Sequence, residues 1–399
     1  MADVTTARNW MVPIIALFLA TFAVGTSELI VAGVLPALAA DFSVDIPTAG
    51  LLITGYALGV AVAAPILSLI TTGLSRRFLL MGVMAVFVAA TALCAVSDSF
   101  WMMLAARLLV ASCHGLFFGV AMVIATRLAP SNRQNSAVSL IVAGVTLSAV
   151  LGIPLGTAIG NAYGWRTTFW LIAVAGVVAG VALFVLIPRL REAERRADSF
   201  AAELRAASRP AVLLCYGIIG LFTTGVFSFF AYLVPILTTA GGMPIGQVPW
   251  VLFGMGLAGF FGNLIGGRLG DWKSTPTMIG ILALFIVLVL AMAMVVTQTW
   301  PLIAMLCLAW LVGFGFPAPV QARILKEAQE APNFASTLIS SAFNIGIAAG
   351  AAIGGAAIAT GWGYGALPLM GVAFLVLALV GTLALAVLDR RTAAIAQPA

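Results

Sequence analysis

The chain has 399 residues, of which 63% are hydrophobic and only 8% are charged. This balance excludes a soluble globular protein, because the surface of such a protein needs many more charged residues. The net charge of +6 does not require a nucleic-acid partner, since a basic cytoplasmic face beside anionic lipid accounts for it. We therefore expect an all-α integral membrane protein that lies in the lipid bilayer.

Twelve apolar runs are each long enough to cross about 30 Å of hydrocarbon as a helix. They cover residues 11–35, 47–72, 78–97, 100–126, 136–160, 166–187, 211–238, 247–270, 276–297, 300–322, 334–359 and 363–388. The first run could instead be a cleaved signal peptide, since Ala37-Leu38-Ala39 resembles a cleavage site. Its apolar region is too long for one, so we expect a retained first helix.

The first span carries Glu28 within VGTSELIVAG (24–33), and Glu28 is the only acidic residue well inside any predicted span. An ionised, unpaired carboxylate would be prohibitive to bury there, so it must be protonated, paired or facing water. Because burial favours the protonated form and a nearby cation favours the ionised form, Glu28 is a candidate proton carrier. The alternative is a structural role, in which Glu28 caps a kink at Gly25 or binds the backbone.

The fourth span places Arg107 and His114 two helical turns apart, and therefore on one face. Glu28 and Arg107 each lie roughly 11–12 Å from the outer end of their span at 1.5 Å per residue, so we expect them to pair. His114, the only histidine, is either a packing residue or a proton relay near mid-membrane. A purely structural role for Arg107, holding the fourth span to its neighbours, is the alternative.

The loops alternate in charge, and this predicts an orientation. Lys and Arg collect at residues 76–77, 127–133, 268–273, 323–326 and 390–391, whereas the intervening loops carry Asp41, Asp45 and Asp98 with Arg166 as their only basic residue. By the positive-inside rule both termini are cytoplasmic. The cysteines fall inside predicted spans without paired spacing, so they indicate neither disulfides nor a zinc site. No cofactor is expected.

The two halves of the chain resemble each other. A polar stretch at 189–210, either a surface helix or a solvated linker, separates residues 1–188 from residues 211–399. At an offset of 198–199 residues the matched pairs are Pro36 with Pro235, Trp101 with Trp300, Gly152 with Gly350 and Gly156 with Gly354. Two related six-span halves are typical of a transporter with a binding site between them.

The second half supplies candidates for the wall of a substrate cavity. They are aromatic residues of the seventh span and neutral polar residues of later spans: Phe227, Phe230, Tyr232, Asn263, Gln321 and Asn344. Phe227 stands near the position that corresponds to Glu28. The aromatic side chains could equally face lipid or the protein core. A site with so few charges suits a neutral or weakly polar, partly aromatic solute.

Three motifs carry a family resemblance. GGRLGDWK (266–273) resembles the loop motif of the major facilitator superfamily, with Gly267 and Asp271 in the marked places, while the first-half SLITTGLSRR (68–77) keeps only the basic residues Arg76 and Arg77. The resemblance implies that these residues gate the inward side, with a buried Asp271 that accepts bonds from backbone N–H groups and an Arg. ARLLVASCHGLFFG (106–119) resembles the second motif of the superfamily.

The third motif, GVTLSAVLGIPLGTAIG (144–160), is similar to the Gly/Pro motif of the superfamily's antiporters. Its small residues Gly152 and Gly156 allow close helix approach, and Pro154 supplies a bend. Together with GWRTTFW (164–170), these motifs make residues 10–390 resemble the twelve-spanner drug/proton antiporters, in their chloramphenicol-resistance and arabinose-efflux-like branch.

This resemblance implies the major facilitator fold, with twelve transmembrane helices in two pseudo-symmetric six-helix halves. It also implies proton-coupled efflux of an amphiphilic small molecule, such as a chloramphenicol-like antibiotic, by a monomer in the bacterial inner membrane. Export of sugars or purine nucleosides is the alternative. An enzyme is not expected, because no nucleophile, metal cluster or pair of carboxylates lies at one depth, and no Walker loop indicates use of ATP. A non-transporting receptor or scaffold stays open.

Overall fold

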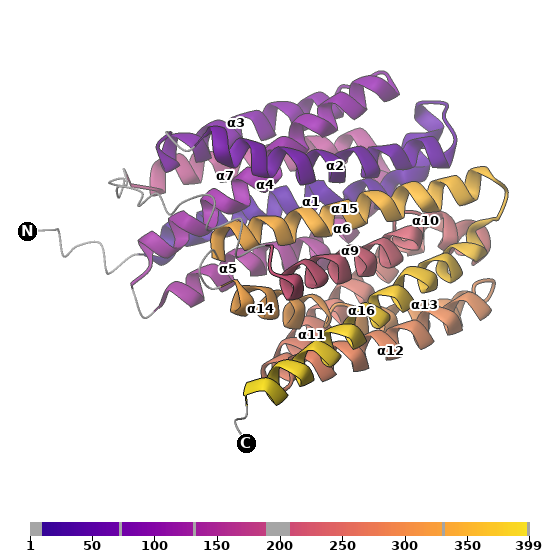
Figure 1. Cartoon of the computed structure of the whole chain (residues 1–399). Helices are drawn as coiled ribbons and strands as arrows, with labels where there is room; N and C mark the ends of the chain where they lie inside the picture. The colour runs from indigo at the N-terminus through magenta and orange to yellow at the C-terminus, as the bar shows by residue number, and fades with distance from the viewer. Residues whose placement is uncertain (1–9, 72–73, 131–132, 189–207, 329–331, 397–399) are drawn as a thin grey trace, which may run out of the picture. The chain divides into compact units, whose positions relative to one another are not determined.

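The structure is a computed structural model that describes residues 10–71, 74–130, 133–188, 208–328 and 332–396. Over these ranges the chain forms helices and short connections without any strand (Figure 1). Most of the predicted central linker, residues 189–207, lies outside the described ranges. An all-helical fold is expected of such apolar segments, because a helix satisfies its backbone hydrogen bonds internally where no water is present.

Twelve helical segments of the described chain are long and apolar enough to span a membrane, which confirms the predicted number. In the first half the helices are α1 (Met11–Asp41), α2 (Ile46–Ile70), α3 (Arg76–Ala95), α4 (Phe100–Leu128), α5 (Gln134–Leu147), α6 (Ile153–Tyr163) and α7 (Trp165–Leu186). In the second half they are α9 (Pro210–Phe230), α10 (Leu233–Pro235), α11 (Val248–Trp272), α12 (Ser274–Met294), α13 (Thr299–Gly313), α14 (Pro317–Glu327), α15 (Pro332–Ala359) and α16 (Leu367–Ala396).

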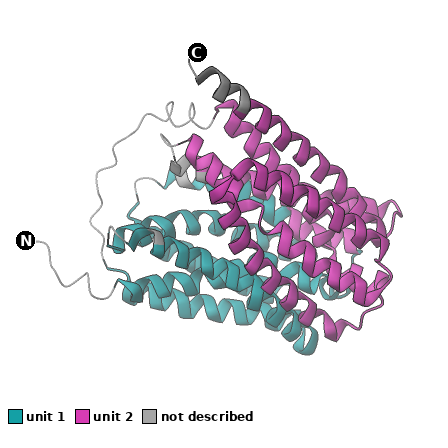
Figure 2. Cartoon of the chain, turned by 90° about the horizontal axis from the view of Figure 1, so that it is seen from below, with its two compact units in different colours: residues 1–45, 55–195 teal, residues 46–54, 196–399 magenta. Residues whose placement is uncertain are grey.

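The chain divides into two compact units (Figure 2). Unit 1 comprises residues 1–45 and 55–195, and unit 2 comprises residues 46–54 and 196–399. The expected halves were 1–188 and 211–399, and the first turns of α2 group here with unit 2.

Each unit repeats the same pattern of helix packing. In unit 1, α1 packs on α5 and α7, and α3 packs on α4 and α7. In unit 2, α9 packs on α15 and α16, and α12 packs on α13 and α16. Counted as spans, the first helix of each half contacts the fifth and sixth, and the third contacts the fourth and sixth. The repeated contacts match the two pseudo-symmetric halves that the sequence predicts.

Matched glycines lie at equivalent close approaches in the two units. A Cβ on Gly152, in a π-helical turn of the fifth span, would collide with the Thr26 side chain of α1, and a Cβ on its counterpart Gly350 of α15 would stand 2.5 Å from the Thr224 carbonyl oxygen of α9. In both halves, therefore, the fifth span approaches the first span through small residues, as the motif implied. This π-helical turn, Ser148–Gly152, ends two residues before Pro154, so the irregularity expected there begins before the proline.

One end of unit 1 is held by Arg166 at the start of α7. Its guanidinium pairs with Asp41 Oδ2 at 2.6 Å, donates to the Ser97 carbonyl at 2.9 Å, and lies 4.3 Å from the Trp165 ring centroid. Trp165 Nε1 donates to the same Asp41 oxygen at 3.3 Å. The end of α1, the α3–α4 connection and the beginning of α7 are thereby joined.

Exposed tryptophans mark the ends of several spans. Trp250 and Trp272, near the two ends of α11, are each 75% exposed, and Trp101 and Trp300 at the beginnings of α4 and α13 are 71% and 77% exposed. Tryptophan prefers the interface between lipid and water, where its ring is apolar and its N–H can meet water. The positions fit helices that end at the two membrane surfaces.

Candidate functional site

A polar cluster lies among apolar helices in unit 1. It consists of Glu28 from α1, Tyr56 from α2, and Arg107 and His114 from α4. Arg107 is 0% exposed, Tyr56 2% and His114 7%, while the Glu28 side chain keeps 16% of its surface accessible. Groups that can carry charge are costly to bury unless each has a partner, so the contacts within the cluster define what it can do.

Arg107 is anchored on the backbone of α1. Its Nη1 donates to the Ser27 carbonyl at 2.5 Å and its Nη2 to the Glu28 carbonyl at 3.0 Å. Its guanidinium lies 3.9 Å from the centroid of the Tyr56 ring, a cation–π contact. Helical carbonyls can accept these bonds because each has a second lone pair beyond the intrahelical one. The planar fork thus joins α4 to α1 while Tyr56 covers its face.

This arrangement corrects the expected ion pair between Glu28 and Arg107. The carboxylate lies instead next to His114, with Glu28 Oε2 at 3.9 Å from His114 Nε2. The physical reason is that the side chain and the carbonyl of residue 28 leave the helix in different directions. Both terminal nitrogens of the Arg107 guanidinium already donate to adjacent carbonyls. Equal depth in the membrane brought the two residues together without pairing their charges.

His114 has a polar neighbour at each ring nitrogen. Nδ1 lies 2.9 Å from Tyr56 Oη, and Nε2 faces Glu28. The ring is also held by Phe118, whose centroid is 4.9 Å away. The carboxylate and the imidazole thus lie close together without a direct hydrogen bond at this distance, and both the relay and the packing interpretations of His114 stay predictions.

Tyr56 was not among the predicted site residues. The signal that could have found it is its place well inside the second span, because tyrosine prefers the membrane interface. The same signal applies to Trp310, which lies inside the tenth span, in α13.

Trp310 belongs to an aromatic cluster of unit 2 that includes two predicted residues of α9. Phe227 and Phe230 are buried, with centroids 5.3 Å apart, and the Phe230 and Trp310 centroids are 4.9 Å apart. Phe314 extends the cluster at 5.8 Å from Trp310. The structure therefore brings Phe227 and Phe230 together and adds two rings from the tenth span.

The other predicted cavity residues fall in different settings. Tyr232 is buried and its hydroxyl donates to the Ala351 carbonyl at 2.8 Å, a bond between the α9 end and α15. Asn344 is buried, its Nδ2 donates to the Ser340 carbonyl at 3.0 Å, and its Oδ1 has no partner among the described residues. Asn263 is partly exposed and Gln321 is exposed. Of these four residues, Asn344 is the one with a buried polar atom that has no hydrogen-bond partner in the described chain.

The predicted gating residue Asp271 does not have the buried, bonded position that its motif implied. It is exposed at the end of α11, and α12 begins without a side-chain cap. The end of α11 presents carbonyls, which disfavour a carboxylate, and no side chain caps the N–H groups at the start of α12. Gly267 of the same motif has no atom within 4 Å of a built Cβ.

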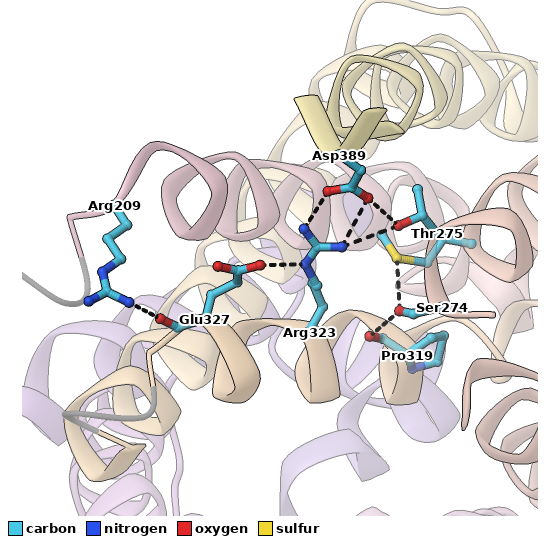
Figure 3. Close-up of polar contacts among 8 residues, drawn as sticks. Arg209, Ser274, Thr275, Pro319, Arg323, Glu327 and Asp389 are labelled. Atoms are coloured by element: carbon cyan, nitrogen blue, oxygen red, sulfur yellow. Dashed lines mark hydrogen bonds and ion pairs between the residues drawn. The ribbon is translucent and has the colours of Figure 1, made fainter. Parts of the chain in front are cut away.

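An ionic cluster in unit 2 forms at other residues instead (Figure 3). Arg323 binds both oxygens of Asp389, at 2.5 and 3.0 Å, and its Nε donates to Glu327 at 3.0 Å. Thr275 donates to Asp389 at 2.9 Å, and Arg209 donates to the Glu327 carbonyl at 2.5 Å. Such a bidentate pair is among the stronger polar contacts. Together these contacts join the beginnings of α9 and α12 to the ends of α14 and α16.

The first-half basic motif has a smaller counterpart in unit 1. Arg77, at the start of α3, donates to the Phe184 carbonyl of α7 at 2.7 Å and lies 5.6 Å from the Phe184 ring centroid. Its neighbour Arg76 is partly exposed. Thr72, at the place of the motif's acid, lies outside the described residues.

Comparisons with known proteins agree with this architecture. The model of the Major Facilitator Superfamily matches residues 17–350. The inner membrane transport protein YdhP of Escherichia coli (strain K12) is 34% identical over 359 residues, which cover 90% of this chain and 92% of that protein. The chloramphenicol resistance protein of Streptomyces lividans is 31% identical over 340 residues, or 85% of this chain and 87% of that protein.

A further relative is the putative transporter AraJ of Escherichia coli (strain K12), which is 31% identical over 356 residues, or 88% of this chain and 89% of that protein. Among solved structures, a bacterial homolog of the human lysosomal transporter Spinster, in an inward-facing and unoccupied conformation, has a TM-score of 0.76. It is 16% identical over 95% of this chain and 97% of that one, so it shows the shared fold alone.

Proposed function

We propose that this chain is a proton-coupled efflux antiporter. The chain belongs to the Major Facilitator Superfamily and is a multi-pass membrane transporter. It exchanges entering protons for an amphiphilic small molecule by alternating access. The single observation that carries the proposal is the contact of Glu28 with His114 inside otherwise apolar helices, at 3.9 Å. An ionisable pair at this depth is costly to keep and is a functional site by default.

The carboxylate supplies the coupling chemistry. When Glu28 faces water it can release its proton, and when the surroundings become dry the neutral form is favoured. A conformational change that alters access to Glu28 therefore links its protonation to the transport cycle, and the linkage is reciprocal. Arg107, held on the α1 backbone, keeps a fixed positive charge near the carboxylate without neutralising it directly.

The substrate class follows from the aromatic cluster and from one relative. Phe227, Phe230 and Trp310 offer flat apolar surfaces, and Asn344 adds one amide oxygen with no partner among the described residues. Such a site suits a neutral, partly aromatic solute. The similarity to a protein named for chloramphenicol resistance makes chloramphenicol the first compound to test. We place the transporter as a monomer in the bacterial inner membrane with both termini in the cytoplasm.

The proposal is tested in proteoliposomes with an imposed pH gradient and labelled chloramphenicol. We expect the parent to move the compound against its gradient and Glu28→Gln to lose at least tenfold of this uphill transport, because glutamine keeps the size but cannot carry a proton. The matched control is Asp98→Asn, which neutralises an exposed loop acid and should transport like the parent.

Ligand binding separates loss of coupling from loss of folding. A compound that binds the folded state raises the apparent melting temperature, so Glu28→Gln should keep the shift that chloramphenicol gives the parent. Sugars and purine nucleosides are run in the same screen. Uphill transport by Glu28→Gln at the parent rate would overturn the proposal.

A further inference from the structure

We propose that Tyr56 is a positioning residue that fixes the tautomer of His114, so that the Nε2 proton points at Glu28. The importance of this for transport rests on the proposed function above, because it matters to coupling only if Glu28 carries the proton. The assignment of the tautomer itself rests on contacts among Glu28, Tyr56, Arg107 and His114 alone. The first step is to count the hydrogens that these groups can share.

A neutral imidazole has one N–H group and one acceptor nitrogen. Tyr56 Oη lies 2.9 Å from Nδ1 and Glu28 Oε2 lies 3.9 Å from Nε2. An ionised carboxylate can only accept, so a proton on Nε2 suits both neighbours, whereas a proton on Nδ1 would turn the lone pair of Nε2 toward the carboxylate. The distance of 3.9 Å is too short for a bridging water, and a small rotation of either side chain would close it to a hydrogen bond.

The hydroxyl of Tyr56 requires the same arrangement. Tyr56 is 2% exposed, and His114 Nδ1 is the hydrogen-bond partner of its hydroxyl within the described chain. A buried O–H group that does not donate is costly, so Tyr56 must donate to Nδ1. Arg107 strengthens this direction, because a guanidinium 3.9 Å from the ring centroid withdraws electron density and makes the phenol a better donor and a poorer acceptor.

This orientation determines which group takes up the proton. A proton added to Nδ1 of His114 would face the O–H of Tyr56 and place two donors against each other. A proton added to Glu28 meets no such conflict. The charged groups that act on the imidazole are the Glu28 carboxylate and the Arg107 guanidinium, with the Cys94 and Cys113 thiols near Tyr56. Tyr56 thus keeps His114 neutral and donating, and Glu28 carries the proton.

Because His114 is the only histidine, its ring nitrogens can be observed directly. We would label histidine with ¹⁵N, purify the full chain with a histidine-free tag, and record the nitrogen shifts in micelles over a range of pH. The expected spectrum of the neutral ring has its proton on Nε2. Tyr56→Phe keeps a ring beneath Arg107 but removes the donor to Nδ1, so the share of the tautomer with its proton on Nδ1 should rise above that of the parent, although Glu28 still favours Nε2.

The matched control is Tyr216→Phe, which removes a hydroxyl bond to the Ala335 carbonyl in unit 2 and should leave the parent spectrum unchanged. A neutral parent ring with its proton on Nδ1 overturns the proposal, and so does a Tyr56→Phe spectrum identical to the parent. If Tyr56→Phe does not fold, the parent spectrum still decides between the tautomers.

Transport then separates this inference from the proposed function. Tyr56→Phe should change the pH profile of chloramphenicol export in proteoliposomes, while Tyr216→Phe should not. If Glu28→Gln exports like the parent but Tyr56→Phe still mixes the tautomers, the antiporter proposal fails and the positioning of His114 stands. If Glu28→Gln abolishes coupling but the tautomer is unaffected by Tyr56→Phe, the positioning proposal fails and the antiporter proposal stands.

Discussion

Arg107 shows how a buried cation can be stabilised without a carboxylate partner. It donates to two consecutive main-chain carbonyls and stacks on Tyr56, so its charge is spread over dipoles and a ring. A guanidinium is suited to this because its donors lie in one rigid plane, whereas a lysine ammonium is a point charge on a flexible stem. The residue therefore acts on Glu28 through the backbone position of α1 as well as through its charge.

Arg107→Ala should destabilise the protein, because it removes two charged hydrogen bonds and leaves their acceptors without the second bond. We expect the free energy of unfolding to fall by about 2–4 kcal/mol, measured by denaturant titration in micelles. Arg107→Lys should recover part of this loss, since one ammonium can reach one carbonyl but cannot stack in the same way. An Ala variant as stable as the parent would contradict this account of the anchor.

Two aspartates of unit 2, one inside the ionic cluster and one outside it, should differ in their effect on the free energy of unfolding. Asp389→Asn should lower the free energy of unfolding by about 1–2 kcal/mol, because a bidentate, partly buried ion pair with Arg323 is weakened. Asp271→Asn should change it by less than about 0.5 kcal/mol, since Asp271 is exposed. Thermal unfolding of both variants at equal lipid content measures this; a larger effect at Asp271 would refute it.

Sequence reasoning identified Glu28 and His114, because a carboxylate and a lone histidine stand out in apolar spans. It did not find Tyr56, and it gave Arg107 the wrong acceptor. Both outcomes depend on how far each helix is rotated about its axis, which decides whether a side chain meets a neighbouring carboxylate or a carbonyl. Depth along the membrane can be counted from the sequence, but rotation is set by the packing of several helices together.

At the scale of elements, the number of spans was predictable and their ends were less so. Length and hydropathy alone determine whether a run can cross the bilayer. The first helix, however, continues to Asp41 instead of ending at 35, with Pro36 inside it, because the Asp41 carboxylate is tied to Arg166 and Trp165. Hydrogen bonds between residues so far apart in the sequence leave no local sequence signal.

Close helix approach in unit 2 predicts a sharp contrast between two glycines. Gly350→Ala should lower the free energy of unfolding by about 1–3 kcal/mol, because the new Cβ would stand within 3.0 Å of backbone atoms of α9. Gly217→Ala, on α9 itself, has nothing within 4 Å and should be neutral or slightly stabilising. Equal unfolding midpoints in matched micelles would show that α15 can move away from α9 at no cost.

For the whole molecule, the loop charges predict an orientation that labelling can test. In a Cys307→Ala background, which leaves only buried native thiols, Asp98→Cys and Lys273→Cys each place one thiol at an exposed position. A membrane-impermeant maleimide should react with the Asp98→Cys protein in intact cells and with the Lys273→Cys protein only after the cells are opened. The reverse pattern would invert the topology.

The spacing of the two exposed tryptophans of α11 indicates the bilayer thickness that suits the protein. Trp250 and Trp272 are about 33 Å apart along the helix at a rise of 1.5 Å per residue, close to the thickness of an average hydrocarbon core. α3 and α12, with 20 and 21 residues, are of similar length. A bilayer of much shorter or longer acyl chains must deform or tilt these helices to keep both rings at its surfaces. The acyl-chain length at which the reconstituted protein is most active thus becomes a structural parameter, fixed by a single helix.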